Sequence, residues 1–176
     1  DSGYGRLNLS QQRKMRITED QIPYKGTLVV AGIDYSKPDA LKQALRFEPE
    51  YFDAQNNLGK ALLQLGWASE AVGYLMHALR LKPNDVQVLN NLGTALFRQG
   101  RVAEAVEQYE QALRLKPEYD EARINLGLVR YQLGEGLAAQ GKWEEAIQQY
   151  ERVIQLKRDN AQAHDSLGLA LSQKRR

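Results

Sequence analysis

With 176 residues, the chain has room for one domain, or for one repeat array with an extension attached. It contains no cysteine, so disulfides, thiol nucleophiles and thiolate metal sites are excluded. The 24 Lys and Arg residues nearly balance the 22 Asp and Glu residues, and a net charge of +2 gives no reason to expect nucleic acid binding. No stretch of about 18 apolar residues predicts a membrane span.

Residues 1–35 show no repeat and are interpreted as an N-terminal extension. Its first ten residues are typical of a flexible tail, and the apolar, β-branched run over 26–33 predicts a strand. Such a strand could pair with a second copy or a neighbour's groove, or it could cover the first helices. Because Asp1 is not Met, we expect a processed, trimmed or incomplete start. The cytoplasm is weakly favoured as the location, and an extracytoplasmic one stays open.

Helical periodicity begins at Ser36. Ser36-Lys37-Pro38-Asp39 predicts an N-cap followed by a first-turn proline, which opens a helix through Phe47. We interpret residues 36–51 as half of an incomplete leading repeat. Two complete repeats are then expected at 52–85 and 86–119, each made of two helices.

A short string marks the repeats. Asn56-Asn57-Leu58-Gly59 returns as Asn90-Asn91-Leu92-Gly93 and then as Ile124-Asn125-Leu126-Gly127, each 34 residues after the last. The small Gly59 and Gly93 predict close helix contacts. Gly66 and Gly100 fall where a helix must stop, because glycine accepts a left-handed backbone. Pro83 and Pro117 close the two repeats.

The third repeat, residues 120–160, contains seven extra residues, and Leu133-Gly134 echoes Leu126-Gly127 one heptad later. Seven residues turn a helix by only about 20° off the original face, which favours a longer first helix. Gly134 and Gly136 would instead suit a loop, since each costs about 1 kcal/mol in a helix. A final helix over 161–173 is expected to cap the array.

The recurring set Leu58, Gly59, Ala71, Ala78 and Pro83 resembles the tetratricopeptide repeat family. The resemblance implies an all-α fold: a right-handed superhelical solenoid of antiparallel helix pairs, with about three to four repeats. It also implies that the first helix of each repeat faces a concave groove that binds protein segments. The predicted domains are therefore the extension over 1–35 and a solenoid over 36–176.

The resemblance places Asn57, Asn91 and Asn125 one above another in this groove, similar to the asparagine ladder of O-GlcNAc transferases. Such amides could hold a peptide backbone, or they could bond only between neighbouring helices. The other predicted groove residues are Asn56, Lys60, Asn90, Thr94, Arg98 and Tyr131. A carboxylate clamp of the chaperone-adaptor type is not expected, because Glu121 stands where that clamp has a cation.

No catalytic constellation, metal site or cofactor motif is found. His77 and His164 lie far apart in the sequence and are interpreted as surface residues. The sequence therefore predicts a non-catalytic scaffold that binds an extended or helical peptide of another protein. Two alternatives stay open: a self-assembling structural protein, and hence a homo-oligomer, or the recognition domain of a larger enzyme such as a glycosyltransferase.

Overall fold

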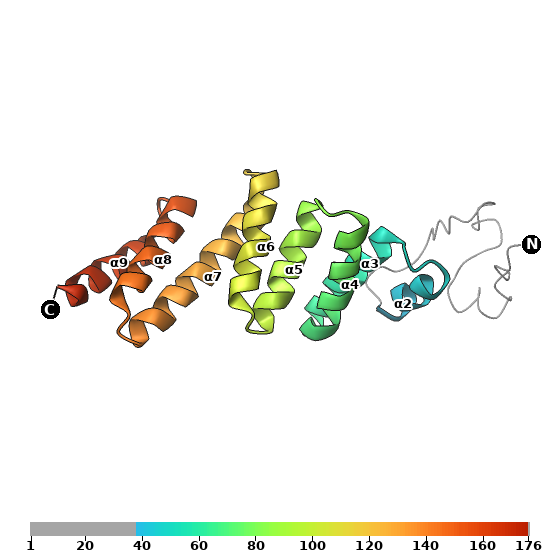
Figure 1. Ribbon diagram of the computed structural model, residues 1–176, viewed down its shortest axis with the longest axis horizontal. Helices are drawn as coiled ribbons and strands as arrows, with labels where there is room; N and C mark the ends of the chain where they lie inside the picture. Colours follow the sequence, from blue (N-terminus) through green and yellow to red (C-terminus); the bar gives the residue numbers. More distant parts are fainter. Residues whose placement is uncertain (1–37, 176) are drawn as a thin grey trace, which may run out of the picture. The chain divides into compact units, whose positions relative to one another are not determined.

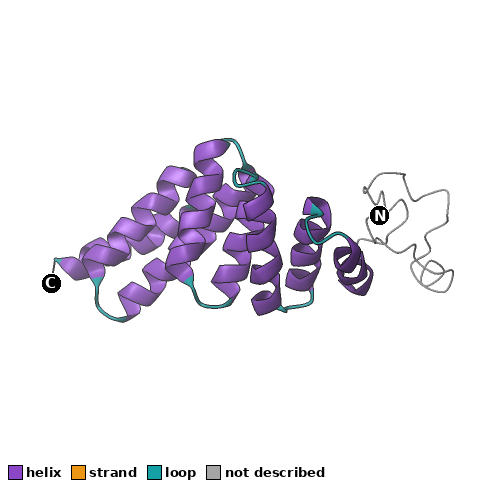
Figure 2. Cartoon of the chain, turned by 45° about the vertical axis from the view of Figure 1, so that its right-hand side comes forward, coloured by secondary structure: helices purple, strands orange, loops and turns teal. Residues whose placement is uncertain are grey.

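A computed structural model describes residues 38–175 of the chain (Figure 1). These residues form helices joined by short loops, and none of them lies in a strand (Figure 2). The helices are α2 (Pro38–Phe47), α3 (Phe52–Gln64), α4 (Ala68–Leu81), α5 (Val86–Arg98), α6 (Val102–Leu115), α7 (Asp120–Ala139), α8 (Trp143–Leu156) and α9 (Ala161–Lys174). The strand predicted over 26–33 lies outside the described residues.

The chain divides into two compact bodies between Lys82 and Pro83. The first body contains α2, α3 and α4, and the second contains α5 to α9. Helices that follow one another in the sequence pack together within each body, as expected of a helical repeat. The continuous solenoid predicted over 36–176 stays a prediction.

In the first body, α3 and α4 form one helix pair. The turn between them contains Gly66, whose φ of +82° is the left-handed conformation predicted for it. A Cβ at Gly59 would lie 2.5 Å from Cγ of Leu75, so only glycine lets α4 approach α3 this closely. Leu75, together with Leu58 and Leu62 of α3, is fully buried in this contact.

In the second body, α5 and α6 repeat this arrangement. Gly100 has a φ of +76° in the turn, and a Cβ at Gly93 would lie 2.7 Å from the ring of Tyr109. Tyr109 takes the place of Leu75 and is 1% exposed. The close contacts predicted for Gly59 and Gly93 are both confirmed.

The seven extra residues of the third repeat lengthen α7, which is one continuous helix of 20 residues. The longer-helix interpretation is therefore confirmed, and the loop is wrong. The glycine that contacts the second helix is Gly134, where a Cβ would lie 2.7 Å from the ring of Tyr150 on α8. No atom outside its own helix lies within 4 Å of a Cβ at Gly127, the glycine that the strict period points to.

α7 thus has two registers. Its N-terminal half continues the spacing of α5, and its C-terminal half pairs with α8 one heptad further on. Seven residues correspond to about 10 Å along the helix axis. Consequently α8 is displaced along α7 by two turns relative to the position that the strict period predicts.

Candidate functional site

The predicted groove residues lie on first helices, as expected. Asn56, Asn57 and Lys60 are on α3 in the first body, and the others are on α5 and α7 in the second body. Lys60 and Arg98 are exposed, whereas Asn56, Asn57 and Asn91 are half-buried. Within the second body, the structure brings Asn90, Thr94 and Asn125 together, and the ladder of three asparagines stays a prediction.

Two of the predicted residues bond to each other. Nδ2 of Asn125 donates to Oδ1 of Asn90 at 2.9 Å, which joins α7 to α5. Asn90 is only 5% exposed, so its amide is held inside the helix contact. For Asn125, the alternative of bonding between neighbouring helices is what the structure shows.

Thr94 also takes part in packing. Its hydroxyl donates to the backbone oxygen of Asn90 at 3.1 Å and lies 3.0 Å from the hydroxyl of Tyr109. Burial raises the pKa of Tyr109, because the phenolate would lose its hydration. Asn90 and Thr94 therefore contribute to the packing of α5 against α6 and α7.

Tyr131 belongs to a polar cluster that joins α7, α8 and α9. Its hydroxyl lies 2.9 Å from Oγ of Ser166. Oε1 of Glu135 accepts hydrogen bonds from the Tyr150 hydroxyl at 2.6 Å and from Oγ of Ser166 at 3.3 Å. The rings of Tyr131 and Tyr150 are tilted at 47° with their centroids 5.7 Å apart. Burial, and then the hydrogen bond to the Glu135 carboxylate, raise the pKa of Tyr150.

Because the pKa of Tyr150 is raised in this cluster, we expect the free energy of unfolding to fall at alkaline pH. Tyr150 loses its proton near pH 10 in the unfolded chain but keeps it there in the folded protein. Its contribution to the free energy of unfolding is therefore complete below about pH 10 and falls as the pH rises further. The slope is up to about 1.4 kcal/mol per pH unit for one tyrosine. Tyr150→Phe should cost about 1 kcal/mol at neutral pH and approach wild-type stability by about pH 11, measured by urea denaturation. A stability difference that is the same at both pH values would contradict this assignment.

Two large apolar side chains are exposed on α7. Ile124 is 67% exposed and Leu128 is 51% exposed, and the two lie one helical turn apart. Sequence analysis did not select Ile124. The signal was present, because Ile124 and Leu128 form an i, i+4 pair that is displaced from the core residues Ala122, Leu126 and Val129.

For Glu121 and the two histidines, the structure agrees only in part with the sequence analysis. Glu121 is exposed and accepts a hydrogen bond from the Tyr119 hydroxyl at 2.7 Å, and the expectation that no carboxylate clamp forms there stays a prediction. His164 is exposed, but His77 is half-buried and its Nδ1 is buried without a hydrogen-bond partner.

Across residues 38–175, no cluster of potential metal ligands is present. None of the helices in this range is long and apolar enough to span a membrane.

Two family models match the chain. One, described as tetratricopeptide repeat, matches residues 85–159, which include α5 to α8. The chain belongs to the tetratricopeptide repeat family. The other, described as bacterial transcriptional activator domain, matches residues 23–120 of this repeat protein. This second match covers more than half of the chain, so the repeat protein also belongs to the bacterial transcriptional activator domain family. The activator role belongs to the proteins after which that family is named.

Solved structures support the same assignment. A crystal structure of MamA is similar to this repeat protein with 27% identity and a TM-score of 0.59, over 78% of this chain and 76% of that chain. A tetratricopeptide repeat protein from Parabacteroides merdae has 22% identity and a TM-score of 0.55, over 78% of this chain and 52% of that one, and shows the fold alone. MamA 41-end from Desulfovibrio magneticus RS-1 also shows the fold alone, with 21% identity, a TM-score of 0.56 and coverage of 73% and 69%. No curated protein matches the sequence.

The predicted family and the all-α, helical-repeat solenoid class are therefore confirmed. The family match and the likeness to MamA support a protein–protein interaction scaffold.

Proposed function

We propose that this repeat protein binds an extended segment of a partner protein along the exposed face of α7 and the neighbouring part of α5. The observation that supports this most strongly is the exposed pair Ile124 and Leu128. Two large apolar side chains one turn apart form a small exposed apolar patch, and such patches are typical of protein interaction sites. The role is that of a non-catalytic scaffold.

Other predicted groove residues of the second body suit a peptide. Arg98, exposed on α5, supplies a cation on the same body, and Asn91 of α5 is half-buried. In an extended segment, alternate side chains would contact Ile124 and Leu128, while the intervening backbone could reach amide groups. Covering the exposed parts of both apolar side chains would contribute roughly 2 kcal/mol. The predicted ladder enters this proposal through Asn91 and Asn125 of the second body, and the amide of Asn125 also donates to Asn90.

The experiment is a selection of random 12-residue peptides on the immobilised full chain. We expect the selected peptides to carry apolar residues at alternate positions and to bind the double variant Ile124→Ser/Leu128→Ser about ten- to thirty-fold more weakly. Binding constants would be measured by fluorescence anisotropy.

The matched control is Leu169→Ser/Leu171→Ser on α9, which removes two other exposed leucines, 60% and 41% exposed. The control should bind the selected peptides with wild-type affinity. Peptides that bind the α7 variant as tightly as the wild type would contradict the proposal. Self-assembly and the recognition-domain alternative stay hypotheses, and no contact within residues 38–175 favours either of them.

A further inference from the structure

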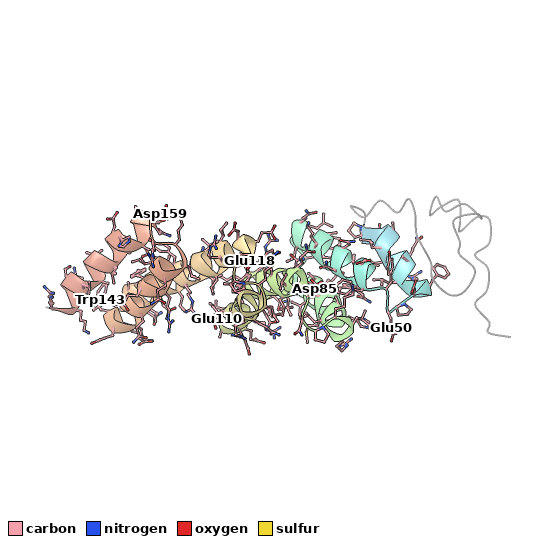
Figure 3. All side chains as sticks on the ribbon, turned by 90° about the horizontal axis from the view of Figure 1, so that it is seen from above. Glu50, Asp85, Glu110, Glu118, Trp143 and Asp159 are labelled. Carbon is pink, nitrogen blue, oxygen red and sulfur yellow. The ribbon has the colours of Figure 1, made fainter. Side chains whose placement is uncertain are left out.

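A cavity of about 340 Å³ lies among α6, α7 and α8 of the second body. Its apolar lining includes Leu126 of α7 and Leu156 of α8. Its charged lining consists of Arg114 and Glu110 of α6, Arg130 of α7 and Arg152 of α8. Glu110 is labelled in Figure 3. Leu126 and Arg130 lie about half a turn around α7 from Ile124 and Leu128, so this site is separate from the proposed peptide face.

The cavity is consistent with the two registers of α7. Both α6 and α8 pack against this helix, and α8 pairs with it one heptad further along than the strict period predicts. The displacement leaves a step between α6 and α8, and the last turns of these two helices line it with long side chains.

Positive charge predominates in this cavity. The side chain of Arg130 is 15% exposed, and its guanidinium forms an ion pair with Glu110 and donates to Oε1 of Gln149 at 2.9 Å. Arg114 and Arg152 are exposed. Arg152 makes only a long bond of 3.4 Å to Gln155, and within the described residues Arg114 has no charged partner. Three guanidinium groups therefore face one carboxylate.

We propose that this cavity binds an acidic segment of a partner protein. A carboxylate side chain would lie between Arg114 and Arg152, because guanidinium groups donate paired hydrogen bonds to carboxylates. Arg130 is anchored by Glu110 and contributes its charge from the wall. The apolar lining and a volume larger than one carboxylate needs favour a peptide with apolar residues beside its acidic ones over a free anion.

The test uses the full chain carrying Ile124→Ser/Leu128→Ser, which removes the apolar pair of the proposed peptide face, and a fluorescein-labelled peptide of alternating Glu and Leu, in buffer of low ionic strength. We expect saturable binding by fluorescence anisotropy, and no binding of the same peptide with Gln in place of Glu. Arg114→Gln/Arg152→Gln should weaken binding about tenfold. Both side chains are exposed, so circular dichroism should show an unchanged fold.

The matched control is Lys142→Gln/Arg175→Gln, which removes two exposed cations outside the cavity. If both double variants weaken binding equally, the effect is one of net charge and the proposal fails. A second arm titrates inorganic phosphate against the labelled complex. Displacement of the peptide by millimolar phosphate at constant ionic strength would contradict the proposed peptide ligand and would indicate a site for a free oxyanion.

A variant that is expected to strengthen binding separates an effect on the site from loss of folding, because an unfolded variant would bind more weakly. Glu110→Gln removes the carboxylate that now pairs with Arg130, so we expect the acidic peptide to bind several-fold more tightly. Weaker or unchanged binding by this variant, with an intact circular dichroism spectrum, would overturn the site.

Discussion

Gly134→Leu is expected to lower the free energy of unfolding by about 3 kcal/mol, measured by urea denaturation. A Cβ at this position would lie 2.7 Å from Cε1 and 3.0 Å from Cδ1 of Tyr150. Tyr150 is 1% exposed and hydrogen-bonded to Glu135, so its ring cannot move aside without breaking other contacts. The larger side chain would force α8 away from α7.

Gly127→Leu is the matched control, because it makes the same change in the same helix one heptad earlier. Nothing outside its helix lies within 4 Å of a Cβ there, and leucine favours a helix over glycine by about 0.8 kcal/mol. We expect this variant to be as stable as the wild type or slightly more stable. If Gly127→Leu were the more damaging of the two, α8 would pair with α7 in the strict 34-residue register, contrary to the structure.

Asn125→Ala is expected to cost about 1 to 2 kcal/mol of unfolding free energy. The change removes the donor that Oδ1 of Asn90 accepts from at 2.9 Å and leaves that buried oxygen without this partner. Thermal and urea denaturation would measure the loss. A double-mutant cycle with Asn90→Ala should show coupling between the two side chains.

Asn57→Ala is the control for this prediction. Asn57 belongs to the same recurring string, but it is half-buried, and its side chain forms no hydrogen bond with any of residues 38–175. We expect its stability to stay within about 0.5 kcal/mol of the wild type. Equal losses from Asn57→Ala and Asn125→Ala would contradict a special structural role for Asn125.

Local features were predictable because they depend on residues close together in the chain. Helical periodicity predicted helices such as α3 and α5, and the C-terminal glycines Gly66 and Gly100 predicted their ends. The continuous α7 was also predictable, since seven added residues keep one face of a helix nearly in line.

The site was less predictable. Sequence analysis placed Asn90, Thr94 and Asn125 in the predicted groove and, for Asn125, left open a bond between neighbouring helices. In the structure all three form hydrogen bonds within the protein. It did not select Ile124 or the arginines of the cavity. Whether a helical side chain faces solvent or another helix depends on the neighbouring helix, and a single periodic pattern does not contain this information.

The sequence by itself determined the repeat, the helices and the family, because a 34-residue period and its glycines act through local backbone preferences. Only the tertiary structure decided which glycine of α7 contacts α8. Gly127 and Gly134 differ by about 20° around the helix, so both satisfy the same apolar pattern. The choice between them rests on the packing of Tyr150 against one glycine and not the other, and that choice also displaces α8 along α7 and leaves room for the arginine-lined cavity.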